Sequence, residues 1–299
     1  MGRRAALGIA ALAVGLLLSA LPAAAGAYIE PGLGVPGAVG VPGRPVPKIL
    51  SASWGTDGKV GCPKGAQGLD NIPVTFNWFI RGEVFPPSAF RVVRSDGTVA
   101  TPTCAIRFPP DENDEAQTVN LIGEFGDAAN GPTPVQVRVA RPLEAKAPGA
   151  HRWSFVWHFA PMRVDPLAGG PYIVDSWTIP PWIYRVDRNR CEVGKTFVRV
   201  MWSNGLTAYP TGEEVGAPVL GSYRALYRLP GGRTVAIAPL EVADLHDHET
   251  SFNADNMHDL CLPRPPRGAT LAGITIGADL IQDPDGDPNE AQRFMVGRG

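Results

Sequence analysis

The sequence lacks the long amphipathic patterns of helices and holds only one long apolar run. Between residues 49 and 142, no segment keeps a helical period over an ordinary helix length. Glycine and proline are abundant instead, at 35 and 31 of 299 residues. Proline lacks an N–H donor and glycine loses the most backbone entropy on folding, so both interrupt helices and suit turns. This composition predicts short strands joined by many turns.

An excess of positive charge and the common catalytic motifs are also missing. The formal net charge is −2 at pH 7, so the chain has no basic surplus to neutralise phosphates. Nucleic acid is therefore not expected as a main partner. The sequence contains no G-x-S-x-G elbow, no P-loop and no N-glycosylation sequon. The missing catalytic motifs favour a non-catalytic protein, and the missing sequon means that N-glycosylation is not expected.

The single long apolar run stands at the beginning of the chain. Arg3 and Arg4 precede it, residues 5–21 form it, and the small residues 23–27 follow it. This order is typical of a cleaved secretory signal peptide, and the alternative is an uncleaved membrane anchor. We expect residues 1–27 to be removed and the mature protein to be secreted, periplasmic or at the cell surface. No membrane span is expected after cleavage.

Only four cysteines occur, and none forms a C-x-x-C pair. An even number of cysteines in an exported chain predicts two disulfides, for which three pairings exist. We expect Cys62–Cys104 and Cys191–Cys261, because each pair closes a loop inside one half of the chain. The absence of C-x-x-C argues against a thioredoxin-type centre or a zinc ribbon.

The remaining sequence reads as strands and turns. Residues 28–48 form a Pro/Gly-rich tether. Apolar and polar residues alternate after it, and Asp96-Gly97 predicts a hairpin turn. We predict an all-β fold of two tandem, antiparallel, Ig-like β-sandwich modules, over residues 49–142 and 150–299. One long mixed sandwich is the main alternative.

Lysine and arginine are missing from two acidic stretches near the C-terminus. Neither occurs between Arg233 and Arg264, or between Arg267 and Arg293. Crowded carboxylates repel one another unless a cation or solvent offsets their charge. Within the second stretch, oxygen-bearing side chains alternate at four positions. They are Asp283, Asp285, Asp287 and Asn289.

The alternating oxygens predict a calcium-type site, because Ca²⁺ takes six to eight oxygen ligands. The run QDPDGDPNE resembles the acidic D-x-D-G-D calcium loops of dockerin-type and thrombospondin-type repeats. This resemblance covers only these few residues and implies calcium binding by them. Gly286 precedes the third acid, and no Glu stands at the twelfth loop position, so the loop is not an EF-hand. The alternative is a solvated acidic turn.

A histidine cluster in the first stretch offers a different metal chemistry. Its members are His246, Asp247, His248, Asp255 and His258. Imidazole suits zinc or copper better than calcium, and a position left open for water permits hydrolysis. An extracytoplasmic metalloenzyme using zinc or copper is therefore the second functional hypothesis. The alternative is exposed loop histidines paired to carboxylates.

Aromatic residues beside Pro180-Pro181 supply the third hypothesis. Trp177, Trp182 and Tyr184 flank this stiff segment and are candidates for stacking on a sugar or peptide. They predict a carbohydrate-binding module, and the alternative is ordinary core packing. The sequence thus favours an exported, non-catalytic binding or structural protein with a calcium-type site. Its expected partner is an extracytoplasmic glycan or protein.

Overall fold

The computed structural model describes residues 46–56, 62, 68–107, 116–147, 150, 152–166, 168–179, 191, 193–213, 215, 217–244 and 256–296. Nearly all of its regular structure is β-strand, and every pair of named strands is antiparallel. The predicted all-β class is therefore confirmed. The expected signal peptide and residues 28–45 of the tether lie outside the described residues.

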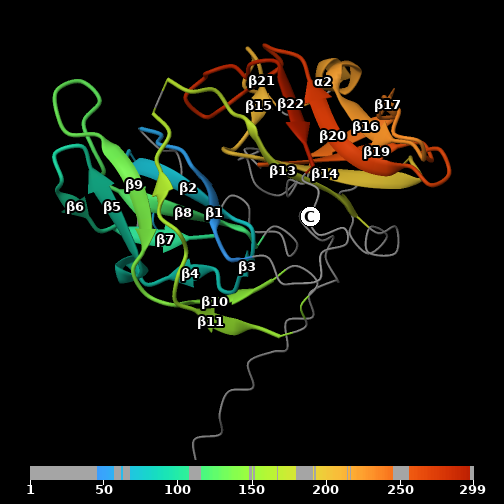
Figure 1. The fold of residues 1–299 in the computed structure, drawn as a ribbon. Helices are drawn as coiled ribbons and strands as arrows, with labels where there is room; N and C mark the ends of the chain where they lie inside the picture. Colours follow the sequence, from blue (N-terminus) through green and yellow to red (C-terminus); the bar gives the residue numbers. More distant parts are fainter. Residues whose placement is uncertain are drawn as a thin grey trace, which may run out of the picture.

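Twelve strands form the sheets of the first half, on the left of Figure 1. They are β1 (Ile49–Ala52), β2 (Asp70–Phe76), β3 (Phe79–Ile80), β4 (Val84–Phe85), β5 (Phe90–Arg94), β6 (Val99–Ala100), β7 (Cys104–Ile106), β8 (Thr118–Gly123), β9 (Pro134–Val139), β10 (Leu143–Lys146), β11 (Ser154–Val156) and β12 (Met162–Arg163). A 3-10 turn, η1 (Pro87–Ala89), precedes β5.

Two of these sheets pack around the first hydrophobic core. The sheet β1-β2-β8-β7-β4 contributes residues such as Val74 and Leu121, and the sheet β12-β9-β5-β6 contributes Phe90 and Val137. Alternate strand residues point to one face, which explains why a period of two in the sequence produces this core. A smaller sheet, β11-β10-β3, lies beside them. The predicted turn at Asp96-Gly97 joins β5 to β6, and Gly97 has a φ of 84°.

The second half repeats this arrangement with ten strands and one short helix. They are β13 (Ile173–Ile179), β14 (Thr196–Trp202), β15 (Thr207–Ala208), α2 (Ala217–Ser222), β16 (Arg224–Arg228), β17 (Thr234–Ile237), β18 (Glu241–Asp244), β19 (Met257–Leu262), β20 (Thr270–Ile276), β21 (Ile281–Gln282) and β22 (Gln292–Met295). The sheets β13-β14-β19-β18 and β17-β16-β20-β22 enclose a core that includes Val200, Tyr227, Leu260 and Ile274.

Strand pairing changes from one half to the other after residue 163. β11 and β12 pair with β10 and β9, and both therefore belong to the sheets of the first half. Both strands lie beyond residue 150, where the second module was expected to begin, and β10 occupies the interval between the two expected modules. A local pattern identifies a strand but not its partner. Among the described residues, no sheet mixes strands from the two halves.

The two halves meet across a polar contact. Ser51 and Ser53 each donate a hydroxyl hydrogen bond to the carbonyl of Ser203, at 3.5 and 3.4 Å. The amide of Asn256 donates to Thr118 Oγ1 at 3.0 Å. Buried polar groups of this kind require partners, so these bonds fix how the outer face of β1 and β8 meets the second half.

Candidate functional site

The acidic run of the second half folds as a turn closed by one of its own carboxylates. Asp283 Oδ1 accepts hydrogen bonds from the backbone N–H groups of Asp285 and Asp287, each at 3.0 Å. Asp283 Oδ2 lies 3.4 Å from the donor amide of Asn204. Asp283 is buried, whereas Asp285 is exposed. The loop therefore holds one inward carboxylate and presents another outward.

The electrostatics of this turn disfavour a charged Asp283. Burial first, and then the negative charges of Asp285 and Asp287, raise its pKa from 3.8 to about 6. The backbone N–H groups that lower the pKa offset only part of this effect. The expected crowding of negative charge is thus present in the structure.

The fourth predicted oxygen ligand is used within the fold. Asn289 Oδ1 accepts the N–H groups of Leu280 and Ile281, and its amide donates to the carbonyls of Gly277 and Glu290. Since all of these bonds are internal, Asn289 ties the chain before β21 and the start of that strand to the chain that follows it. Asn289 is therefore a poor candidate for a calcium ligand, because its side-chain oxygen already accepts two hydrogen bonds.

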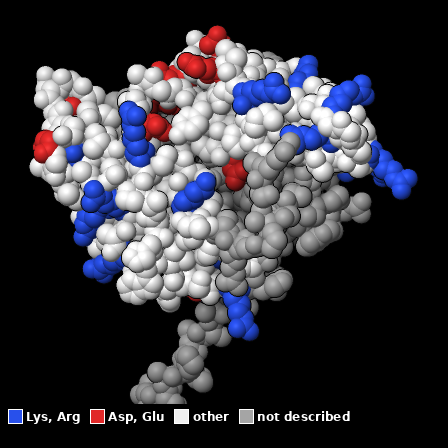
Figure 2. All heavy atoms as spheres, in the orientation of Figure 1, with Lys and Arg blue, Asp and Glu red and all other residues white. Residues whose placement is uncertain are grey.

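The acidic turn lies against the first half and the segment that connects the halves. Asp285 Oδ2 approaches Gly55 so closely that a Cβ on this glycine would lie 3.1 Å away. Gly170 packs on the carbonyl of Pro288, where any side chain would overlap. Acidic side chains gather at the top of Figure 2, where Figure 1 places the end of β21.

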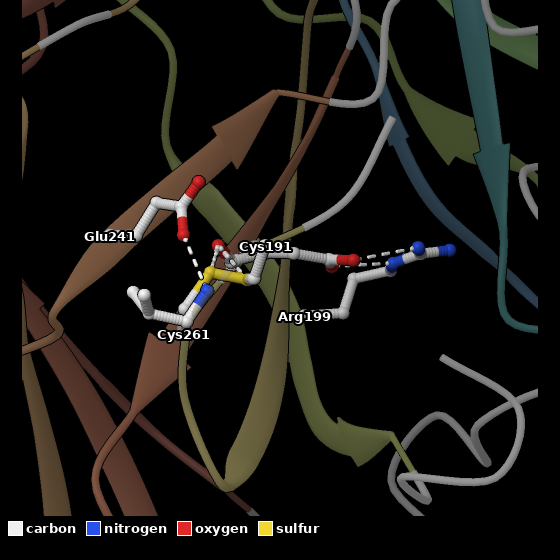
Figure 3. Close-up of a disulfide and its surroundings, with 6 residues drawn as sticks. Cys191, Arg199, Glu241 and Cys261 are labelled. Carbon is white, nitrogen blue, oxygen red and sulfur yellow. Dashed lines mark hydrogen bonds and ion pairs between the residues drawn. A yellow bond between two sulfur atoms is a disulfide. The ribbon is translucent and has the colours of Figure 1, made fainter. Parts of the chain in front are cut away.

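Figure 3 shows a second group of ligand-type atoms, at one end of the sheet that contains β18 and β19. Cys191, Glu241 and Cys261 each place one such atom within 4.8 Å of the others, and no further group of three meets this criterion in the described part of the chain. The carboxylates of the acidic turn therefore do not converge to this extent.

The sulfur atoms of that group are joined to one another. Cys191–Cys261 is a disulfide, as is Cys62–Cys104, so both predicted pairings are confirmed. Glu241 lies opposite Cys261 in the β18–β19 register and accepts the N–H of Val193 at 3.1 Å. Zinc binds thiolates, so this group becomes a metal site only after reduction.

His258 lies between the two sheets of the second half instead of in a surface loop. It sits fully buried on β19, where its Nδ1 is 2.8 Å from the hydroxyl of Tyr223. Burial lowers its pKa to about 3, so the ring is neutral. The expectation of a loop histidine is wrong at this position, because Met257–Leu262 forms a central strand. His246, Asp247, His248 and Asp255 lie outside the described residues.

The aromatic prediction also requires correction. Trp177 is buried in a hydrophobic cluster with Phe197, Met201 and Met257, so it offers no open ring for stacking. Trp182 and Tyr184 lie outside the described residues. Among the described residues the most exposed aromatic rings are Phe155 and Trp157, each 67% exposed, which the sequence indicated only as part of an alternating strand.

Comparison with known proteins identifies no relative. No family model, no curated protein and no solved structure matches the chain. In the part of the chain that the structure describes, no helix has the length and apolar character needed to cross a membrane.

Proposed function

We propose that this protein is an exported, non-catalytic β-sandwich protein that binds a divalent cation of the calcium type in its acidic turn. The two disulfides indicate an oxidising environment outside the cytoplasm. We further propose that the N-terminal signal exports the protein, and that it has a binding or structural role outside the cytoplasm.

The observation that carries the cation proposal is the charge balance around Asp283. Three carboxylates lie close enough for Asp285 and Asp287 to raise the pKa of Asp283. A bound cation would relieve this repulsion. Since the three carboxylates do not converge within 4.8 Å, backbone carbonyls and water would complete the six to eight oxygens around calcium.

The position of the turn gives such a cation a structural role. Asp285 faces Gly55 of the first half, and Pro288 packs on Gly170 of the connecting segment. A cation in the turn would therefore stiffen the contact between the halves. A non-catalytic role is supported by His258 and Asn289, whose described polar contacts are made within the fold.

Thermal unfolding of the mature protein in calcium and in chelator tests this function. Calcium at millimolar concentration should raise the melting temperature, because a ligand of the folded state stabilises it by mass action. Asp285→Ala should abolish the rise.

Asp127→Ala is the matched control. Asp127 also closes an exposed turn, by accepting the N–H groups of Ala129 and Asn130 in the first half. This variant should lose some stability and keep the calcium response. Equal melting temperatures of the unmodified protein in calcium and in chelator would refute the proposal.

A further inference from the structure

The small sheet of the first half ends in a strand that is unusually exposed. β11 is the edge of the sheet β11-β10-β3, at the lower end of the first half in Figure 1. Ser154 and Phe155 are exposed, and Trp157 follows at 67% exposure. Large aromatic rings exposed to this degree on neighbouring positions mark a binding surface more often than isolated apolar residues do.

The rings share a face with a group of charged side chains. Phe155 of β11 lies opposite Glu144 of β10 in the strand register, and Glu144 forms an ion pair with Arg81 at 2.8 Å. Lys146 Nζ and Arg81 Cζ lie 4.9 and 5.9 Å from the ring centroid of Trp153. Positions 153, 155 and 157 alternate, which places their side chains on one side of extended backbone.

The charge of this segment is opposite to that of the whole chain. Residues 141–158 contain three cations, Arg141, Lys146 and Arg152, and one acid, Glu144, whereas the net charge of the protein is −2. Arg141 and Arg152 are exposed. Figure 2 shows basic and uncharged side chains in this lower region and hardly any acidic ones. The segment therefore complements an anionic partner.

We propose that this surface, consisting of Phe155, Trp157 and the cations Arg81 and Lys146, docks the protein on an anionic lipid bilayer. A membrane interface offers both chemistries at once: an apolar layer for aromatic rings and negative headgroups for cations. This proposal does not depend on calcium binding, because it uses no residue of the acidic turn.

The shape of the surface favours a bilayer over a peptide or a glycan chain. Phe155 and Trp157 project from an exposed edge strand, and Ser154 on the other side of that strand is exposed as well. Projecting rings suit insertion between headgroups, whereas a peptide ligand would run along the strand edge and a glycan would lie on a broad face.

Vesicle co-sedimentation of the mature protein, carried out in chelator, tests the proposal. The protein should bind vesicles of phosphatidylcholine mixed with phosphatidylglycerol, and bind pure phosphatidylcholine more weakly. Trp157→Ala should lower the partition coefficient about tenfold or more, as expected for one lost aromatic anchor. Lys146→Gln should lower it about fivefold, and salt should reduce the difference.

Two exposed residues of the second half provide the control. Leu240 and Tyr209 are 52% and 37% exposed, and Leu240→Ala and Tyr209→Ala should bind like the unmodified protein. Each variant's melting temperature verifies its fold. Failure to bind anionic vesicles, or equal loss in the control variants, would overturn the proposal. So would Trp157-dependent binding to soluble polygalacturonate without vesicle binding, which would assign the surface to a glycan.

Discussion

Arg199 and Asp259 form a two-pronged ion pair inside the second half. They lie opposite each other on β14 and β19, with Nε to Oδ1 at 2.9 Å and Nη2 to Oδ2 at 3.0 Å. Their side chains are 2% and 0% exposed. Consecutive strand residues point to opposite faces, so Asp259 faces away from the core that holds His258. The pair occupies the same face as Trp177 and Met257.

Breaking this pair should destabilise the protein strongly. Asp259→Asn leaves the Arg199 charge buried without its counter-charge, and we expect a loss of about 3–5 kcal/mol in the free energy of unfolding. Arg199→Met combined with Asp259→Leu should recover much of that loss, because it removes both charges. Chemical denaturation measures all three free energies. A loss below about 1 kcal/mol for Asp259→Asn would show a solvated pair.

His258 should make the protein sensitive to mild acid. Its pKa is lowered from 6.5 to about 3, so the folded protein excludes a proton that the unfolded chain takes up below pH 6.5. The free energy of unfolding should therefore fall as the pH drops from about 6.5 toward 3. His258→Asn should be less stable at pH 8, since it leaves a cavity, but its stability should change less across this range. If the free energy of unfolding of His258→Asn and of the unmodified protein depended on pH in the same way, the burial of His258 would be contradicted.

Asp175 should have the opposite effect. Burial raises its pKa from 3.8 to about 6, while the N–H of Ser176 and the charge of Lys48 act against that rise. The folded protein then holds the proton more tightly, and the free energy of unfolding falls as the pH rises from about 4 through 6. Asp175→Asn should be more stable than the unmodified protein at pH 8, by about 1–3 kcal/mol, with a smaller gain at pH 4. If Asp175→Asn were less stable than the unmodified protein at pH 8, the charge of Asp175 would not be unfavourable in the folded state.

After reduction, the cysteines of one disulfide should bind zinc and those of the other should not. A phosphine reductant converts Cys191 and Cys261 to thiols, and these two groups with Glu241 can then bind zinc and release the thiol protons. The double variant Cys62→Ser/Cys104→Ser should bind one zinc when reduced and none when oxidised. Reduced Cys191→Ser/Cys261→Ser is the control and should bind none. Equal zinc in both reduced variants would exclude the Glu241 group.

The fold class and the disulfides could be predicted because they depend on local patterns. Alternating apolar residues produced the sandwich cores around Val74 and Val200, and pairing cysteines within each half placed both bonds correctly. Strand partners were not predictable in this way. β11 follows a turn-rich segment and yet returns to β10, because long-range packing decides its partner.

The side-chain pairs of the second half show the same limit. Arg199 and Asp259 are 60 residues apart, and only a lone arginine within the apolar run FVRVMW hinted at a buried partner. Acidic residues surround His258 in sequence, and this pattern favours a metal ligand or an exposed loop histidine over a buried strand residue. In the alternating strand MHDLCL, the His258 side chain points to Tyr223, while its neighbour Asp259 points to the opposite, equally buried face of the sheet.

Elemental analysis of the mature protein tests the central proposal most directly. The protein should be purified without added metal, dialysed against millimolar calcium, and separated from free ions before the measurement. The acidic turn predicts about one calcium per chain, lost in Asp285→Ala, with no stoichiometric zinc or copper. An absence of bound calcium, or near-stoichiometric zinc or copper in its place, would contradict the account.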